Sequence, residues 1–212
     1  MKKFQQYTKH WIQAESIDEK KKRSAALLRL LKKTYPSAKI ALKYGNNIQL
    51  LVAVILSAQC TDKKVNEVTA SLFKKYKTAK DFASAKPGVF EQEIRQTGFY
   101  RAKAKNIIAA CKKIEMEFDR TLPRTMAEIL TLPGVARKTA NVVLGNAYGV
   151  VEGIAIDTHM IRLSQRLGFT KETAPVKIEK DLMALFPQNK WFGLTYKLIS
   201  HGRAICIARR PK

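Results

Sequence analysis

Helical spacing of apolar residues, interrupted by proline and glycine, constrains the fold of this chain more than any other feature. Apolar side chains recur every three to four positions through most of the sequence, and strand-like alternation is scarce. Proline and glycine mark the breaks between the periodic segments. The pattern predicts an all-α fold, with helices near 22–34, 47–58, 63–76, 89–96, 101–118, 125–130, 135–147, 158–166, 175–185 and 190–203.

Three of these segments carry more specific expectations. Residues 48–58, IQLLVAVILSA, are apolar on every side and predict a buried central helix. Asp62 is placed to cap the helix that follows. Residues 1–21 lack a clear apolar stripe, and we expect them to form a loosely attached basic N-terminal extension.

The charge of the chain indicates a polyanionic partner. Lys and Arg number 40 against 17 Asp and Glu, which gives a net charge of +23, while 46% hydrophobic residues supply a core. Nucleic acid is the leading partner. A membrane is not expected, because no apolar stretch approaches the roughly 20 residues of a spanning helix. The N-terminus also lacks an apolar signal core, so we expect an intracellular protein.

The cations cluster in two segments that contain no acid, residues 100–114 and 129–151. Surfaces that face phosphate have this composition, whereas a solvated helix face usually mixes both signs. We therefore expect Arg101, Lys103 and Arg137 to contact nucleic acid. An ordinary solvated surface remains the alternative.

The stretch LPGVARKTANVVL, residues 132–144, places a Pro-Gly turn before a helix with Arg137 and Lys138 in its first turn. A helix N-terminus disfavours cations by roughly 0.3–1 kcal/mol. A phosphate held by the backbone N–H groups of the turn at Gly134 would remove that conflict for Arg137.

For Lys138, the same position at the start of the helix suggests a chemical role. The helix end, burial and neighbouring cations would all favour its neutral amine, which is a nucleophile. Helical spacing predicts that Ala136, Ala140, Val143 and Ala147 pack inward, with Lys138, Asn141 and Gly145 on the opposite side. The alternative is a solvated lysine on an amphipathic helix.

Asp157 follows Lys138 by nineteen residues, in the stretch AIDTHMIRL. It either caps the next helix or serves as an ionised carboxylate that stabilises a positive transition state and moves protons. The two roles are compatible. The three cysteines, Cys60, Cys111 and Cys206, have no close spacing, so a disulfide framework is not expected.

Taken in order, LLVAVILSAQCTD, GFYRAKAKNI, LPGVARKTANVVL, AIDTHMIRL and HGRAICIARRPK resemble the endonuclease III family of the helix-hairpin-helix DNA glycosylase superfamily. The similarity runs from about residue 22 to the last residue. A hairpin alone indicates only DNA binding, whereas Lys138 and Asp157 together with SAQ before TD are far more specific.

The resemblance implies a two-domain, all-α protein that binds DNA across the cleft between its domains. A six-helix domain would cover 40–151, with the helix-hairpin-helix near 125–147. A second domain, the iron-sulfur domain of the family, would join 22–39 to 152–212.

The resemblance also implies the activity of a base-excision DNA N-glycosylase and DNA-(apurinic or apyrimidinic site) lyase. Lys138 would attack C1′ of an oxidised pyrimidine nucleoside, expel the base as a Schiff base forms, and nick the strand by β-elimination. Asp157 would assist base loss and proton transfer. The expected partner is double-stranded DNA with damaged pyrimidines or abasic sites, bound by a monomer that is cytoplasmic and nucleoid-associated in a prokaryote.

Other residues match the family one by one. Because a duplex hides C1′, the nucleotide must be flipped out of the stack. Gln59 matches the residue that fills the vacated space, and Phe99 matches the wedge on the opposite strand, where the family commonly has leucine. Asp62 matches a residue at the cleft, although capping would explain it equally well.

Two features depart from the family pattern. Ala136 stands where the second glycine of the hairpin is usual, so this turn must suit a residue with negative φ. Cys206 matches the first of four cysteines around a [4Fe-4S] cluster, and the other three ligands are absent from this chain. We expect a sequence that stops short of those ligands, the alternative being a protein that works without the cluster.

Three other functions remain as alternatives. An adenine mismatch glycosylase of the same superfamily lacks the lysine nucleophile. A non-catalytic helix-hairpin-helix DNA-binding protein gives no reason for Gln59, Lys138 and Asp157 to occur together. An RNA-binding protein would be expected to show an aromatic-rich β platform, which the sequence does not predict.

Overall fold

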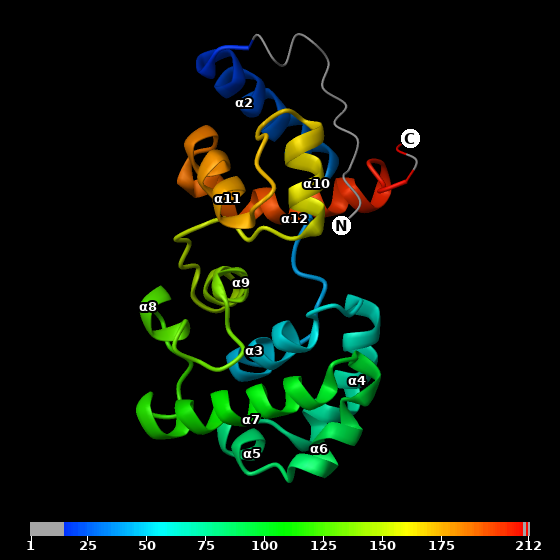
Figure 1. The fold of residues 1–212 in the computed structure, drawn as a ribbon, viewed down its shortest axis with the longest axis vertical. Helices are drawn as coiled ribbons and strands as arrows, with labels where there is room; N and C mark the ends of the chain where they lie inside the picture. The colour runs from blue at the N-terminus through cyan, green and yellow to red at the C-terminus, as the bar shows by residue number, and fades with distance from the viewer. Residues whose placement is uncertain (1–14, 210, 212) are drawn as a thin grey trace. The chain divides into compact units, whose positions relative to one another are not determined.

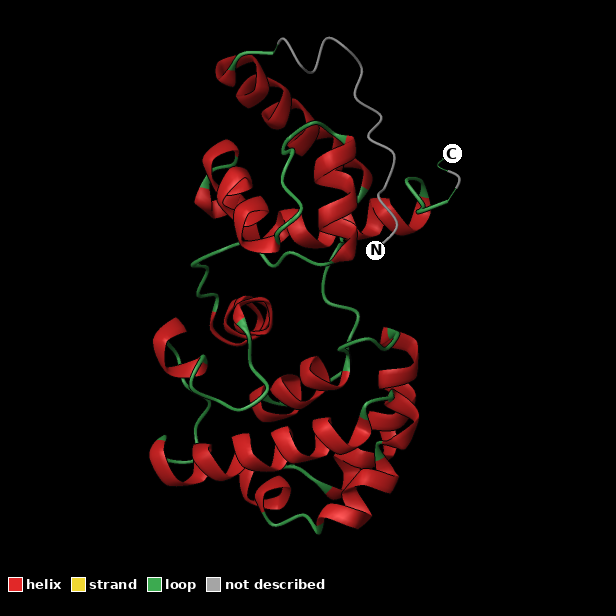
Figure 2. Ribbon diagram, in the orientation of Figure 1, coloured by secondary structure: helices red, strands yellow, loops and turns green. Residues whose placement is uncertain are grey.

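The computed structural model describes residues 15–209 and 211, and this part of the chain is helical without strands (Figure 2). The predicted all-α fold is therefore confirmed. The elements in chain order are α2 (Ile17–Thr34), α3 (Asn47–Leu56), α4 (Asp62–Lys75), α5 (Ala79–Ala83), α6 (Pro87–Glu93), the 3₁₀ helix η1 (Arg95–Thr97), α7 (Tyr100–Glu117), α8 (Met126–Ile129), α9 (Arg137–Tyr148), α10 (Thr158–Arg166), α11 (Pro175–Leu185) and α12 (Gln188–Ala204) (Figure 1).

The chain divides into two compact units. One, which we call the middle unit, is Ala41–Val150, and the other, the terminal unit, is built from the described parts of Met1–Ile40 and Val151–Lys212. The terminal unit thus joins helices from the two ends of the sequence, α2 with α10, α11 and α12.

The middle unit is organised around α3. Every residue from Ile48 to Leu56 is buried, which confirms the central helix that the apolar run predicts. Helices α4, α7 and α9 all pack against α3, and α5 and α6 pack against α7. The centres of the Tyr76, Phe82 and Phe90 rings lie 5.2 to 6.0 Å apart, so the three rings pack against one another.

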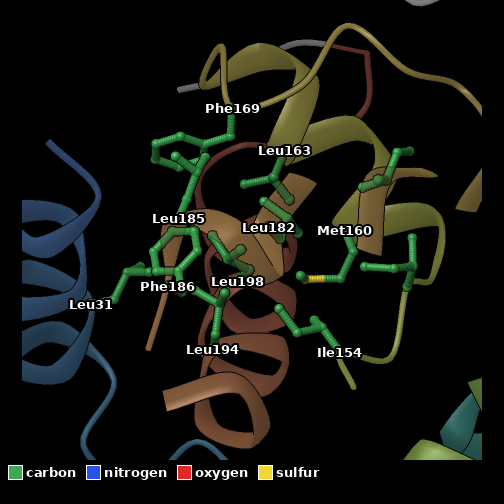
Figure 3. Packing of buried hydrophobic residues seen from close by; sticks show 12 residues of the cluster. Leu31, Ile154, Met160, Leu163, Phe169, Leu182, Leu185, Phe186, Leu194 and Leu198 are labelled. Carbon is green, nitrogen blue, oxygen red and sulfur yellow. The ribbon is translucent and has the colours of Figure 1, made fainter. Parts of the chain in front are cut away.

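The terminal unit has a core of its own, in which α12 contacts α2 and α10 (Figure 3). Aliphatic and aromatic side chains from all four helices and from the segment before α10 meet there. The core consists of Leu31, Ile154, Ile156, Met160, Leu163, Phe169, Ile178, Leu182, Leu185, Phe186, Leu194 and Leu198.

Helix α2 begins earlier than the sequence predicts, at Ile17 instead of residue 22. Ser16 caps it, since the Ser16 hydroxyl accepts from the Glu19 N–H at 3.3 Å and the Glu19 carboxylate accepts from the Ser16 N–H at 2.8 Å. Glu15 also pairs with Arg23 at 2.7 Å. Residues 17–21 are therefore helical and residues 15–16 are tied to that helix, so neither forms part of a loose extension, while residues 1–14 lie outside the described residues.

The structure differs from the predictions at two other places, the start of α4 and the helix α5. Thr61, not Asp62, caps α4, because the Thr61 hydroxyl accepts from the Lys64 N–H at 3.2 Å. Asp62 is the first residue of the helix, where a negative charge is favourable. Helix α5 was not predicted. Its five residues are too few to show helical periodicity, and a capping box between Thr78 and Asp81 starts it.

No helix in the described ranges combines the length and the apolarity that crossing a bilayer requires.

The burial of Cys111 leads to a prediction about thiol chemistry. Cys111 is 1% exposed on α7, and burial raises its pKa to about 12. Because the thiolate is the reactive form, iodoacetamide at pH 8 should modify the half-buried Cys60 and Cys206 before Cys111 in the folded protein. Denaturant should expose all three. Peptide mass spectrometry checks this, and native labelling of Cys111 at a rate similar to that of Cys60 would contradict it.

Candidate active site

A tight turn between α8 and α9 begins the candidate site. Leu132 and Val135 are buried, and the Val135 N–H donates to the Leu132 carbonyl at 3.1 Å. Gly134 between them has a φ of +79°, in the region that favours glycine. A Cβ at Gly134 would lie 2.8 Å from the Cβ of Asn106 on α7. The turn therefore needs glycine both for its backbone and for its close approach to α7.

Ala136 is the N-cap residue of α9. Its φ of −101° and ψ of 170° are extended backbone, so alanine fits where the family resemblance led us to expect glycine. Ala136 offers no side-chain cap, and the first turn of α9 contains no acid. The first N–H groups of a helix have no acceptor within the helix, so this end suits an anion such as a phosphate oxygen.

Arg137 and Lys138 are the first two residues of α9, which places both in its first turn as predicted. Arg137 is half-buried, and Lys138 is exposed. Burial, one of the three influences expected to favour the neutral Lys138 amine, therefore does not act on it.

The buried face of α9 differs in part from the prediction. Ala140 and Val143 are buried as predicted, but Ala136 is exposed. Asn141 and Gly145, which we expected beside Lys138 on the outer face, are buried. Because α9 packs against both α3 and α8, its buried surface is wider than a single apolar stripe.

Asp157 is the N-cap of α10. Its Oδ1 accepts from the Met160 N–H at 2.8 Å, so the capping interpretation of the sequence holds. The three residues before it, Ile154–Ile156, are buried, and the Glu179 carboxylate accepts from the Ile154 N–H at 3.1 Å. These contacts hold the carboxylate of Asp157 at the start of the helix. A carboxylate has two oxygens, so an Asp157 that caps the helix through Oδ1 still has Oδ2 for other interactions.

Gln59 and Phe99 share an uncommon backbone conformation. Gln59 has a φ of 54° and Phe99 a φ of 48°, both in the left-handed region that non-glycine residues adopt at a cost of about 1–3 kcal/mol. Both side chains are exposed, Phe99 to 65%. An exposed phenylalanine held on a strained backbone is unfavourable for folding alone, and such outliers gather at functional sites.

The two cations predicted on α7 have different surroundings. Arg101 is exposed, with its guanidinium 5.5 Å from the centre of the Tyr100 ring. Lys103, by contrast, is 5% exposed, and its ammonium donates to the carbonyls of Leu56 and Thr97, each at 2.8 Å. The prediction that Lys103 contacts nucleic acid is therefore corrected, because its ammonium is buried inside the unit and is not placed to bind a phosphate.

Cys206 lies just after α12, where the Arg166 guanidinium donates to its Sγ at 3.2 Å. A [4Fe-4S] cluster requires four thiolates or equivalent ligands. Across the described residues, no group of three or more His, Cys, Asp and Glu side chains is placed to hold a metal ion. These residues do not fit the cluster that the resemblance implies.

Most of the predicted site lies in the middle unit. Gln59 follows α3, Phe99 precedes α7, and Lys138 lies in the first turn of α9, and both α7 and α9 pack against α3. Asp62, half-buried, opens α4, which also contacts α3. Asp157 belongs to the terminal unit.

Comparison with known proteins shows the family of the chain. Residues 52–188, which contain the α8–α9 hairpin, Lys138 and Asp157, match the family model of the HhH-GPD superfamily base excision DNA repair proteins. The chain belongs to this superfamily.

Individual members of the superfamily resemble the chain over most of its length. It is 55% identical over 192 residues to the endonuclease III of Synechocystis sp., an alignment that covers 91% of this chain and 88% of that one. It is 43% identical to the endonuclease III of Bacillus subtilis, over 84% of this chain and 81% of that one. A solved structure of a trapped endonuclease III-DNA covalent intermediate matches with a TM-score of 0.87 and 41% identity, covering 91% and 90% of the two chains.

The hairpin turn yields a paired prediction. Gly134→Ala and Gly149→Ala both place a Cβ at positive φ, but an added Cβ meets nothing within 4 Å at Gly149, whereas at Gly134 it meets Asn106. Gly149→Ala should lower the free energy of unfolding by about 1–2 kcal/mol, and Gly134→Ala should lower it further and also weaken binding to duplex DNA. Denaturant unfolding and DNA titration measure the two effects. Equal losses for the two variants would contradict a packing role for Gly134.

Proposed function

We propose that this protein is a bifunctional DNA glycosylase and AP lyase of the endonuclease III type, which removes oxidised pyrimidines from double-stranded DNA. The observation that carries the proposal is Lys138. It is an exposed lysine at the start of an acid-free helix N-terminus, in a chain whose fold matches that of an endonuclease III trapped covalently on DNA. Such a lysine is poorly placed for stability and well placed for attack on a sugar next to a bound phosphate.

DNA would be anchored first through its backbone. The N–H groups after Gly134 hold one phosphate oxygen at the start of α9, and Arg137 adds a positive charge beside it. Arg101 adds a second contact from the exposed face of α7. These groups read no base, so they position the duplex without selecting a sequence. Selectivity comes instead from how readily a damaged pair opens.

Opening the duplex requires side chains that replace the flipped nucleotide. Gln59 enters the vacated stack, and Phe99 wedges against the opposite strand. The left-handed backbone of both residues supports these roles, because the folded protein already bears the strain of presenting an amide and an aromatic ring to solvent. Binding then need not supply that free energy.

The chemistry then proceeds at C1′ of the flipped nucleotide. The lone pair of the Lys138 Nζ forms a bond to C1′, the glycosidic bond breaks with its electrons on the leaving base, and the base takes up a proton. Loss of a proton from nitrogen and opening of the sugar ring give the Schiff base. Removal of a C2′ proton then expels the 3′ phosphate by β-elimination, and water releases the enzyme.

Asp157 contributes a carboxylate to these steps. It stabilises the positive charge that develops on the sugar as the base departs, and it accepts and returns protons. Its hydrogen bond to the Met160 N–H fixes the position of the carboxylate that performs both tasks. None of these steps passes through an iron-sulfur cluster.

The partner that this function implies is damaged duplex DNA, bound by a single copy of the chain. Abasic sites are substrates for the lyase half of the reaction, since they present C1′ without a base. The enzyme works where the chromosome lies, which in a bacterial cell is the cytoplasm.

The proposal predicts a covalent intermediate that depends on Lys138. Borohydride should trap the wild-type protein on duplex DNA with an abasic site, and Lys138→Ala should reduce trapping to background while weakening DNA binding by no more than about tenfold, or 1.4 kcal/mol. Lys74→Ala removes an exposed lysine from α4 and serves as the matched control. Denaturing gels measure trapping. Undiminished trapping by folded Lys138→Ala would overturn the proposal.

A further inference from the structure

Lys103 is a buried cation for which the proposed reaction has no direct use. It lies on the inner face of α7 with Ile107, Ala110 and Ile114, at the spacing of a helix core stripe. A lysine is almost never fully buried unless its ammonium is paired. Burial lowers the pKa of Lys103, and the nearby Cys60 opposes that effect. The free energy of desolvating this ammonium must be offset by its contacts.

The contacts of Lys103 join two chain segments that are far apart in sequence. Its Nζ donates to the carbonyl of Leu56, the last residue of α3, and to the carbonyl of Thr97, the last residue of η1, both at 2.8 Å. The C-terminal carbonyls of helices carry partial negative charge and lack helical donors. An ammonium that donates to both satisfies these carbonyls and fixes the distance between them.

Both carbonyls belong to residues that lie two or three positions before the strained residues. Leu56 precedes Gln59 by three residues, and Thr97 precedes Phe99 by two. Gln59 and Phe99 are exposed and have positive φ. Without a fixed point behind them, such segments would relax toward the negative φ values that non-glycine residues favour. The hydrogen bonds of the Lys103 ammonium reach the start of both segments.

We propose that Lys103 is a positioning residue. By binding the Leu56 and Thr97 carbonyls, it holds the segment with Gln59 and the segment with Phe99 at a fixed distance from each other, so that both side chains enter the duplex together. The inference rests on the proposed function, in which these side chains replace the flipped nucleotide. Lys103 touches neither DNA nor the reacting atoms. Its loss should impair opening of the duplex and leave the chemistry of Lys138 in place.

The test compares one abasic site in two settings. In duplex DNA the nucleotide must be extruded before attack, and in a single strand it need not be. Lys103→Met keeps the length of the apolar stem and removes the donors, while Lys74→Met makes the same change at the exposed lysine on α4. Gln59→Ala is the reference for a direct loss of stack filling. Single-turnover nicking rates are measured on both substrates.

We expect Lys103→Met to lower the duplex rate by about tenfold or more and the single-strand rate by no more than about twofold. Gln59→Ala should show the same selectivity, and Lys74→Met should leave the ratio of the two rates unchanged. A 2-aminopurine next to the lesion gives an independent signal, because its fluorescence rises when the stack opens. That rise should be slower with Lys103→Met.

The outcomes separate this inference from the proposed function. Duplex-selective loss in Gln59→Ala with none in Lys103→Met overturns the positioning role alone. Absence of selectivity in both variants overturns the stack-filling role as well, and absence of nicking by the wild type overturns the proposed function. Should Lys103→Met not fold, Lys103→Arg takes its place, since a guanidinium keeps the charge but is longer and planar, and so presents its donors to the two carbonyls at a different distance and angle. The same selective loss is expected, and an unchanged ratio overturns the inference.

Discussion

Burial of α3 is the constraint on which the middle unit depends. Its apolar residues from Ile48 to Leu56 are hidden on every side, so the helices around it must supply complementary surfaces. Those helices are α4, α7 and α9. The loop with Gln59 leaves the C-terminus of α3, Phe99 stands at the N-terminus of α7, and Lys138 stands at the N-terminus of α9. Packing one apolar helix therefore fixes the origin of each group that we propose to act on DNA within this unit.

The electrostatics of helix ends explain why these residues sit where they do. The N-terminus of α9 is uncapped by a side chain and free of acids, so it favours a bound anion. The N-terminus of α10 has the opposite arrangement, with the Asp157 carboxylate held on the Met160 N–H. The C-termini of α3 and η1 hold the buried ammonium of Lys103. The same backbone dipole serves three different purposes in one chain.

Sequence patterns predicted what depends on local spacing, and they missed what depends on tertiary contacts. Residues 158–166 form α10 as predicted, because apolar periodicity and an N-cap coincide there. The start of α2 was missed because a capping box at Ser16, outside the periodic stripe, sets it. Lys103 was predicted at the surface from its charge, although its position on the core stripe of α7 was a usable signal. The positive φ of Gln59 and Phe99 had no signal at all, since non-glycine residues adopt it only where packing imposes it.

If Lys138 is the nucleophile, the covalent adduct with DNA must be on its side chain, and the position of the adduct can be measured. The borohydride-reduced complex with abasic DNA would be digested with nuclease and protease, and the peptide that carries the sugar remnant sequenced by mass spectrometry. We expect a single modified residue, Lys138, at the start of α9. A remnant on another lysine or on the N-terminal amine would contradict it, and would assign the helix N-terminus to phosphate binding alone.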